Sequence, residues 1–288
     1  MLRQILLSTR PRQWLKNLFV FPALIFSQHL LEWWSAIQVI GAFVCFVGLS
    51  GAIYLINDLL DIEQDRIHPR KSKRPLASGS LSVSTARVSS ILIISGAIFL
   101  AFILNFQFGC IASIYVVLNV AYSVRLKHVV LLDVICVAAG YLLRAVGGAV
   151  VIDVQISTWF ILCIFNVTLF IATTKRRQEL VHLHGQAAEH REALQEYSLP
   201  FLDQLISVLT SATLVCYALY AMGGGEEAGA KEMRWTIPFV LYGVFRYLFL
   251  VYRREEGAEP EDVVWRDRPL QITILSWLAA SLVGLYAN

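Results

Sequence analysis

Three aspartates follow a long apolar run, and their spacing suits a bound cation. Asp58, Asp61 and Asp65 occupy positions i, i+3 and i+7 of one short segment. In a helix this spacing places all three carboxylates along one face, where they can point at a common centre. Oxygen ligands of this kind suit Mg²⁺, which takes a few carboxylates and completes its coordination with substrate phosphates. The spacing therefore predicts a magnesium site, in which Asp58 and Asp61 are the candidate catalytic residues.

Basic residues come directly after the aspartates. They are Arg66, His68, Arg70, Lys71, Lys73 and Arg74. Lysine and arginine bind phosphate oxygens through charge-assisted hydrogen bonds, so this cluster suits a phosphorylated substrate. The alternative is a solvated charged loop between two hydrophobic segments, which is what most runs of charge are. The aspartate spacing and the rarity of idle carboxylates in membrane segments favour a phosphate-binding site.

The composition indicates that these charged residues belong to a membrane protein. Of the 288 residues, 57% are hydrophobic and only 16% are charged, and the mean hydropathy is +0.62. A soluble domain has a far more polar balance. The five cysteines lie in apolar runs without paired spacing, which argues against a disulfide framework or a zinc site. The predicted fold class is an all-α integral membrane protein, with residues 1–288 forming one polytopic domain.

Nine apolar segments approach the roughly 20 residues that a membrane-spanning helix needs. They are 14–31, 36–57, 86–104, 106–122, 131–152, 156–174, 199–222, 235–252 and 269–287. Only Asn105 and Gln107 interrupt the apolar run between the third and fourth spans. Residues 1–12 place leucine and isoleucine opposite arginine, which is typical of an amphipathic segment at the membrane surface.

The distribution of lysine and arginine predicts the orientation. Of the 24 such residues, Arg144 and Arg246 fall within expected spans, and Lys231 and Arg234 fall in the connection between the seventh and eighth. The other 20 lie in the N-terminal segment, in the connections after the second, fourth, sixth and eighth spans, or, for Lys16 and Arg87, within the first three residues of an expected span. Because cytoplasmic connections carry the excess of positive charge, we expect these regions and the N-terminus on the cytoplasmic side.

One expected span carries an arginine that needs a polar environment. Arg144 follows Asp133 by eleven residues, which is close to three helical turns, so the two side chains share a face. An arginine at the centre of a membrane segment costs about 2.5–3.5 kcal/mol on insertion scales. We therefore expect Arg144 to face a polar cavity or an acidic partner. A purely structural pair between helices is the alternative.

The connection after the sixth span contains a second basic group. Lys175 and Arg176 are followed by Glu179, at i+4 and i+3. This spacing permits ion pairs within one helix, each worth about 0.2–0.5 kcal/mol. It also permits a second phosphate-binding rim, and the spacing alone leaves both interpretations open.

Several stretches together resemble one known family. NDLLDIEQD, which begins at Asn57, is similar to the NDxxDxxxD signature of the UbiA superfamily of intramembrane prenyltransferases. Other similar stretches are RPRQWLKN (10–17), the whole of 54–79, LKHVVLLDVICVAAGYLLRAVGGAV (126–150), KRRQEL (175–180) and RDRPLQ (266–271). The resemblance implies nine transmembrane helices, cytoplasmic loops over a central cavity, and phosphates bound through Mg²⁺ at the aspartates. Most members carry a second aspartate motif where this chain has KRRQEL, which resembles the branch that transfers phosphoribose to a lipid.

This branch implies a transfer of 5-phosphoribose from phosphoribosyl diphosphate to a polyprenyl phosphate, at the cytoplasmic face of a bacterial inner membrane, for a cell-envelope glycan. Asp58, Asp61 and Asp65 would hold Mg²⁺ and the departing diphosphate. The expected substrate contacts are Lys16, Asn57, Arg66, Lys71, Lys73, Arg74, Tyr122, Lys127, Arg144, Lys175, Arg176, Glu179 and Tyr197. Lys16, Lys127 and Arg144 are expected at the lipid phosphate or in the cavity wall. Lys175, Arg176 and Tyr197 are expected at the far side of the donor.

Two other functions compete with this one. An aromatic prenyltransferase would use a prenyl diphosphate donor, but the missing second aspartate motif and the surplus of bases argue against it. A transporter for an anionic lipid or metabolite would usually show repeated halves with broken helices, and no repeat is visible. A nucleic-acid partner is not expected, and the sequence is compatible with a homo-oligomer.

Overall fold

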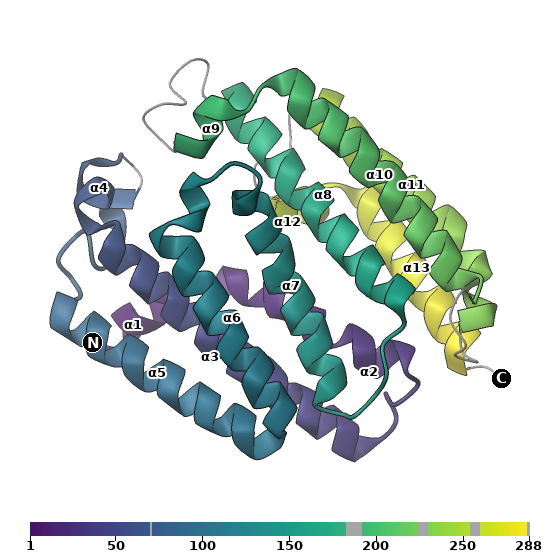
Figure 1. Ribbon diagram of the computed structural model, residues 1–288, viewed down its shortest axis with the longest axis horizontal. Helices are drawn as coiled ribbons and strands as arrows, with labels where there is room; N and C mark the ends of the chain where they lie inside the picture. The colour runs from purple at the N-terminus through teal and green to yellow at the C-terminus, as the bar shows by residue number, and fades with distance from the viewer. Residues whose placement is uncertain (70, 183–191, 224–229, 254–259, 287–288) are drawn as a thin grey trace. The chain divides into compact units, whose positions relative to one another are not determined.

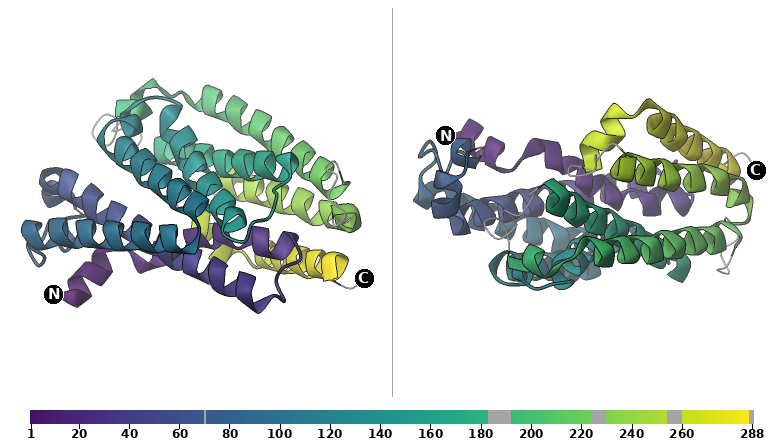
Figure 2. Two further views of the ribbon diagram at one scale, coloured as in Figure 1. Left: turned by 60° about the horizontal axis from the view of Figure 1, so that its bottom comes forward. Right: turned by 90° about the horizontal axis from the view of Figure 1, so that it is seen from above.

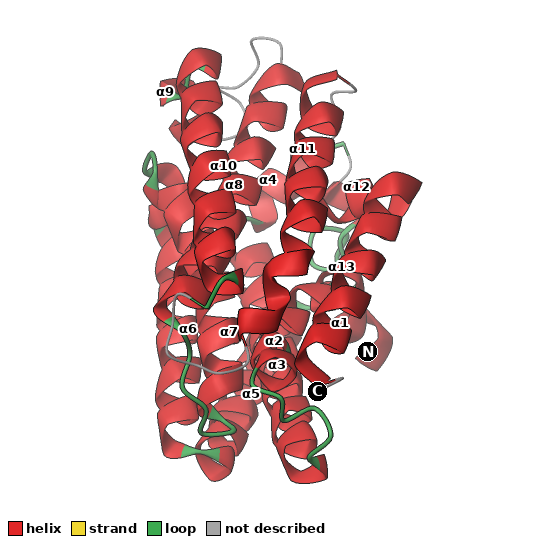
Figure 3. Ribbon diagram, turned by 90° about the vertical axis from the view of Figure 1, so that its right-hand side faces the viewer, coloured by secondary structure: helices red, strands yellow, loops and turns green. Residues whose placement is uncertain are grey.

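The computed structural model describes residues 1–69, 71–182, 192–223, 230–253 and 260–286. Within these ranges every regular element is a helix and none is a strand, as Figure 3 shows. The all-α class predicted from composition is therefore confirmed. Contacts divide the chain into two compact units, one of residues 1–24, 29–126 and 143–155, and the other of residues 25–28, 127–142 and 156–288.

Eight helices in the described residues are long and apolar enough to cross a membrane. They are α3 (Trp33–Leu60), α5 (Val83–Leu104), α6 (Phe106–Val124), α7 (Leu132–Val150), α8 (Thr158–His182), α10 (Leu199–Ala221), α11 (Ile237–Arg253) with the end of η5 (Ala230–Thr236) before it, and α13 (Arg268–Tyr286). At 1.5 Å per residue, helices of about 20 residues span the hydrocarbon core. The protein is a multi-pass membrane protein.

The expected first span, 14–31, is not one continuous helix. It is divided into the 3₁₀ helix η1 (Pro11–Val20) and the short helix α2 (Pro22–Phe26). Pro22 has no backbone N–H and so cannot extend a helix that approaches it from η1. Phe21 instead donates to the carbonyl of Leu18 with the tighter spacing of a 3₁₀ turn, at 3.0 Å. The count of nine spans is therefore not confirmed, and the side of the N-terminus stays a prediction.

The predicted boundary at Asn105 is confirmed. Asn105 leaves the helical region (φ −165°, ψ 135°), and its side-chain oxygen accepts hydrogen bonds from the N–H groups of Gln107 and Phe108. An N-cap of this kind pairs backbone donors that the first turn of a helix would otherwise leave without partners. The cap therefore ends α5 and begins α6 within one residue.

In the first unit, α3 packs against α5, α6 and η1, and Figure 1 shows α3, α5 and α6 side by side. Its core is aromatic: Phe46 meets the rings of Phe108 and Tyr115 at centroid distances of 5.7 and 5.2 Å. Gly148 lets the end of α7 pass close to η1, because a Cβ there would lie 2.0 Å from the carbonyl oxygen of Val20. This close approach brings η1 against the membrane helices.

In the second unit, α8 and α10 lie side by side, as both views of Figure 2 show. The helices α11 and α13 form a second pair, with α12 (Pro260–Arg266) packed against α13. Phe170, Ile206 and Leu250 belong to the buried core of this unit. Short elements, α9 (Glu192–Glu196) and η3 (Leu126–His128), lie in its polar connections.

Candidate functional site

The aspartate segment is two helices joined at one of the aspartates. Asp58 lies in the last turn of α3, and Asp61 is the residue at which α3 ends and α4 (Ile62–Ile67) begins, with φ −98° and ψ 12°. Asp65 lies in α4. Because the helix breaks at Asp61, the single continuous face predicted from the spacing is not present. Asp58 and Asp65 are both 2% exposed, whereas Asp61 is half-buried.

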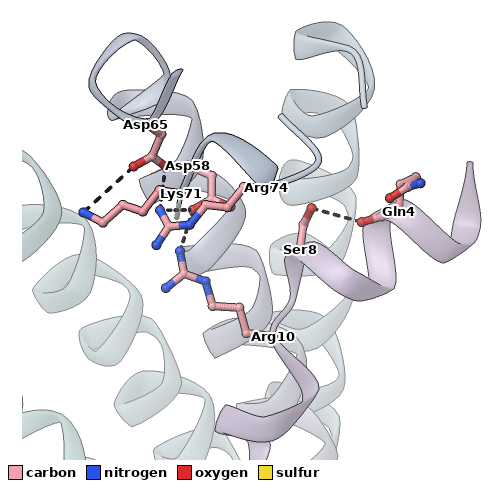
Figure 4. Close-up of polar contacts among 7 residues, drawn as sticks. All are labelled: Gln4, Ser8, Arg10, Asp58, Asp65, Lys71 and Arg74. Carbon is pink, nitrogen blue, oxygen red and sulfur yellow. Dashed lines mark hydrogen bonds and ion pairs between the residues drawn. The ribbon is translucent and has the colours of Figure 1, made fainter. Parts of the chain in front are cut away.

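The structure brings two of the three aspartates to one arginine, which Figure 4 shows. The Nη1 atom of Arg74 lies 2.5 Å from Asp65 Oδ2 and 3.2 Å from Asp58 Oδ1. Lys71 Nζ is 4.0 Å from Asp65 Oδ1. A buried carboxylate is retained only where it is paired and hydrogen-bonded. The structure thus pairs two of the aspartates directly with the basic cluster, and Arg74 is the centre of these contacts.

A small apolar cluster holds the basic segment against α3. Leu76 and Leu81, which are 1% and 3% exposed, pack with Leu55 of α3. Gly79 has a φ of +77°, a left-handed conformation that glycine adopts without strain. The turn around it lets Leu81 N–H donate to the carbonyl of Pro75 at 2.9 Å. Burial of these leucines holds the segment folded back against α3, where Arg74 reaches the aspartates.

Arg10 also belongs to this cluster, although the sequence analysis did not select it. Its Nη2 donates to Asp58 Oδ1 at 2.5 Å, and its guanidinium carbon lies 4.6 Å from the centre of the Tyr54 ring. The Arg10 backbone is left-handed (φ 54°, ψ 71°) between α1 (Leu2–Ser8) and Pro11, which costs about 1–2 kcal/mol for a residue other than glycine. The only signal in the sequence was an arginine directly before a proline, in a stretch already noted for its resemblance.

The remaining predicted contacts near the aspartates are more exposed. Arg66 is exposed and pairs with Glu63 at 2.9 Å, one turn away on α4. Lys73 is exposed in the short helix η2 (Lys71–Lys73), and Asn57 is half-buried. Arg70 lies outside the described residues. Their roles at a substrate phosphate stay predictions.

The donor set fits a divalent cation that uses two carboxylates. Asp58 and Asp65 both accept from the Nη1 atom of Arg74, so a carboxylate from α3 and one from α4 meet at the same cationic group. In the described residues, no group of three or more histidine, cysteine, aspartate or glutamate side chains is placed to hold a metal. Mg²⁺ does not need such a group, because it commonly takes one or two carboxylates together with substrate phosphates and water.

A second buried polar group forms around Asp133, which is fully buried. Arg176 Nε donates to Asp133 Oδ2 at 2.6 Å and also pairs with Glu179 through Nη1. Tyr197 Oη donates to Asp133 Oδ1 at 2.7 Å and accepts from the N–H of Leu131 at 2.8 Å. Burial raises the pKa of Tyr197, and its hydrogen bond to Asp133 raises that pKa further. The ion pair within α8 that the spacing permitted, Arg176 with Glu179, is therefore present. Asp133 is a second acidic partner of Arg176 that the spacing did not predict.

Arg144 is buried and contacts two neutral polar side chains of the first unit. Its Nε donates to Asn17 Oδ1 at 2.8 Å and its Nη2 donates to Tyr115 Oη at 2.7 Å. Asn17 in turn donates to Ser50 Oγ at 3.2 Å. These contacts hold η1, α3, α6 and α7 together. The acidic partner expected from the helical spacing is not among these contacts, because α7 turns Arg144 toward the amide of Asn17.

Four predicted contacts remain, all half-buried: Lys16, Tyr122, Lys127 and Lys175. Each takes part in a polar or ring interaction. Their partial burial is compatible with a role at a substrate, and those roles stay predictions.

Comparison with known proteins assigns the family. The family model described as "UbiA prenyltransferase family" matches residues 17–263. The chain belongs to this family. The resemblance inferred from the aspartate motif is therefore confirmed. The assignment of the chain as a UbiA-type transferase is confirmed with it.

Two curated relatives of this UbiA member are similar over nearly its whole length. Decaprenyl-phosphate phosphoribosyltransferase of Mycolicibacterium smegmatis is 32% identical over 97% of this chain and 91% of the relative. The protein of the same name from Corynebacterium glutamicum is 31% identical over 97% of this chain and 86% of the relative. Among solved structures, a UbiA homolog from Archaeoglobus fulgidus bound to GPP and Mg²⁺ has a TM-score of 0.75 and 19% identity, covering 98% of this chain and 99% of that one. At this identity the structural likeness supports the fold alone.

Proposed function

We propose that this UbiA member transfers 5-phosphoribose from phosphoribosyl diphosphate to a polyprenyl phosphate and releases diphosphate. The observation that carries the proposal is the pair of buried carboxylates, Asp58 and Asp65, with Arg74, Arg10 and Lys71 around them. Carboxylates can bind a cation and the bases beside them can bind a polyanion, so the site suits the two together. The relatives at 31–32% identity, which are named for phosphoribosyl transfer to decaprenyl phosphate, support the choice of donor and acceptor.

The aspartates would hold the metal. Asp58 and Asp65 are the proposed ligands of Mg²⁺, and Asp61, at the junction between α3 and α4, is the third candidate. When bound, the cation would neutralise negative charge on the diphosphate as that group leaves.

The basic residues would bind phosphate oxygens. Arg74 and Lys71 already lie at the carboxylates, and Arg66, Lys73 and Asn57 lie on the same segment. In the reaction the bond between C1 of the ribose and the diphosphate oxygen breaks, and an oxygen of the lipid phosphate bonds to C1. The attacking oxygen is already anionic, so the protein needs no strong general base. Its contribution would be alignment and electrostatic stabilisation of the leaving group.

The other predicted contacts divide into two groups. Arg144 is tied to Asn17 and Tyr115, which supports a place in the wall of the lipid site rather than at a reacting atom. Arg176 and Tyr197 share Asp133, and Arg176 also engages Glu179, which supports a role in positioning. Lys16, Tyr122, Lys127 and Lys175 remain proposed contacts of the lipid phosphate or of the donor.

The proposed setting is the cytoplasmic membrane of a bacterium, with the site on the cytoplasmic face. There the product would serve a cell-envelope glycan, and a homo-oligomer is compatible with this role. The competing candidate is transfer of a prenyl group, the chemistry for which the family is named. Both use a diphosphate donor, so the aspartate cluster does not separate them.

One incubation tests the proposal. Purified protein in nanodiscs is mixed with Mg²⁺, phosphoribosyl diphosphate and a polyprenyl phosphate, and the lipid is analysed by mass spectrometry. A parallel reaction contains a prenyl diphosphate with 4-hydroxybenzoate as the acceptor. The proposal predicts a phosphoribosylated lipid in the first reaction. A prenylated aromatic product in the second reaction, with unchanged lipid in the first, would reverse the assignment.

A further inference from the structure

The carboxylate of Asp133 joins segments that lie far apart in the sequence. Its Oδ2 accepts from Arg176 of α8, and its Oδ1 accepts from Tyr197, which directly follows α9. The Tyr197 hydroxyl also accepts from the backbone N–H of Leu131 at 2.8 Å, across 66 residues of sequence. Asp133 is fully buried and Tyr197 is 5% exposed, so these hydrogen bonds are shielded from water. We call these four residues the Asp133 network.

Leu131 has a strained backbone at the point where the chain enters α7. Its φ is 67°, a left-handed conformation that is unfavourable for a residue other than glycine. Such a conformation persists only where its surroundings determine it, and it is concentrated at functional sites. The carbonyl of Leu131 accepts from Ile135 in the first turn of α7, while its N–H lies before the helix and is taken by Tyr197. Tyr197 therefore fixes the beginning of α7 from another part of the chain.

The connection that ends at Leu131 carries a proposed substrate contact. Lys127 lies four residues earlier, in the short helix η3, and is half-buried. A single 3₁₀ turn has poorer hydrogen-bond geometry than an α-helix, so its own bonds hold it weakly. The place of Lys127 therefore depends on how the ends of the connection are held. At the end next to α7, the bond from Leu131 to Tyr197 supplies this hold.

We propose that Tyr197 and Asp133 are positioning residues that act through Lys127. The hydroxyl of Tyr197 holds Leu131, Asp133 orients that hydroxyl, and the connection thereby places the ammonium group of Lys127 at a substrate phosphate. Arg176 compensates the charge of Asp133 and keeps it ionised as an acceptor. This inference rests on the proposed function in taking Lys127 as a phosphate contact. It goes beyond that function because Tyr197, expected from the sequence at the donor itself, acts on the substrate indirectly.

Steady-state kinetics of the full-length protein in nanodiscs tests the inference with Tyr197→Phe, which removes only the hydroxyl. The KM values for phosphoribosyl diphosphate and for polyprenyl phosphate are measured separately. Lys127→Gln should raise one of them, and Tyr197→Phe should raise the same one about tenfold, the scale of one lost hydrogen bond. The other KM and kcat should not change. In the double variant the KM should be no higher than in Lys127→Gln alone, because residues that act through each other are not additive.

Tyr252→Phe is the matched control. The Tyr252 hydroxyl donates to Asp203 at 2.8 Å, and Asp203 also accepts from Arg177, which adjoins Arg176 on α8. Both tyrosines thus donate to an aspartate that is paired with an arginine of the same helical turn. The bond of Tyr252 joins α11 to α10 rather than to the beginning of α7. Tyr252→Phe should therefore leave both KM values unchanged.

Hydrogen–deuterium exchange tests the positioning without any turnover. Peptides that cover residues 126–131 should exchange about tenfold faster in Tyr197→Phe than in the unaltered protein, because the bond that holds Leu131 is gone. The same peptides should exchange at the unaltered rate in Tyr252→Phe.

Two results would overturn the inference. One is unchanged exchange at residues 126–131 in Tyr197→Phe. The other is a rise in KM that adds in full to the rise in Lys127→Gln, because additive effects show that the two residues act independently. If Tyr197→Phe does not fold, Asp133→Asn, which keeps the shape of the side chain, replaces it in both measurements. An unaltered protein that transfers no phosphoribose would contradict the proposed function, and the exchange at 126–131 would still decide whether Tyr197 holds the connection.

Discussion

Arg74 Nη1 lies 2.5 Å from Asp65 Oδ2, so the last base of the cluster, rather than the first, reaches the last aspartate. This contact joins α4 to the segment after η2, nine residues later in the chain. Arg66 follows Asp65 directly, but adjacent residues of a helix do not face each other, and Arg66 pairs with Glu63 at the surface. The packing of Leu76 and Leu81 against α3 holds the segment that carries Arg74 beside these helices.

Loss of either buried aspartate should abolish transfer. Asp58→Asn and Asp65→Asn each remove a ligand charge at the proposed metal site, and we expect transfer of labelled phosphoribose to fall at least about 100-fold, the scale seen when one stabilising group is removed from an active site. Glu63→Gln is the matched control, because Glu63 is an exposed carboxylate on α4, the helix of Asp65. Near-normal activity in Asp58→Asn would refute the assignment of this aspartate.

Breaking the ion pair between Arg176 and Asp133 should lower the stability of the protein markedly. Arg176→Ala leaves the fully buried carboxylate of Asp133 without its guanidinium, and breaking such a pair costs about 3–5 kcal/mol. Thermal unfolding in detergent measures the effect. The double variant Arg176→Gln with Asp133→Asn should be more stable than Arg176→Ala. Arg66→Ala, which breaks an exposed pair, should change stability by less than about 1 kcal/mol.

The contribution of Tyr197 to the stability of the protein should fall at alkaline pH. Its pKa is raised above the usual 10.0 by burial and by the hydrogen bond to Asp133. A group that holds its proton more tightly when folded stabilises the protein fully below its unfolded pKa, and that contribution falls as pH rises through the folded pKa. The stability difference between the unaltered protein and Tyr197→Phe should therefore be constant from pH 7 to 9 and shrink above about pH 10. Thermal unfolding of both proteins across this range checks the prediction, and a difference that grows with pH would contradict it.

Replacement by alanine should change the stability very differently at two glycines in membrane helices. In Gly148→Ala the new Cβ would lie 2.0 Å from the backbone oxygen of Val20, so η1 must move. We expect a loss of about 3 kcal/mol or more, the upper range for an overpacked core. Gly96→Ala, with no atom within 4 Å of the added Cβ, should be neutral or stabilising by up to about 1 kcal/mol. Thermal unfolding of the two variants gives the comparison, and equal unfolding temperatures would show that η1 accommodates the methyl group.

The membrane class and most helix positions were predictable from local information. Hydropathy alone locates a spanning helix, because each must satisfy its own backbone hydrogen bonds in lipid. Asn105 was recognisable as a boundary because it and Gln107 are the polar residues between two apolar runs, and Asn105 is indeed the N-cap of α6. The broken helix at 14–31 was not predicted, because hydropathy does not register the missing N–H of Pro22.

The sequence by itself determined which chemical groups are present: aspartates at helical spacing, bases after them, and a family signature that names their chemistry. Only the tertiary structure decided which groups meet. Arg10 reaches Asp58 across 48 residues, because η1 packs on α3 and Gly51 admits Thr9. Arg176 meets Asp133 because their helices come together in one unit, and not through any spacing in the chain. Local spacing governs contacts within a helix, whereas the burial of apolar surface selects which distant segments come together and so which charges pair.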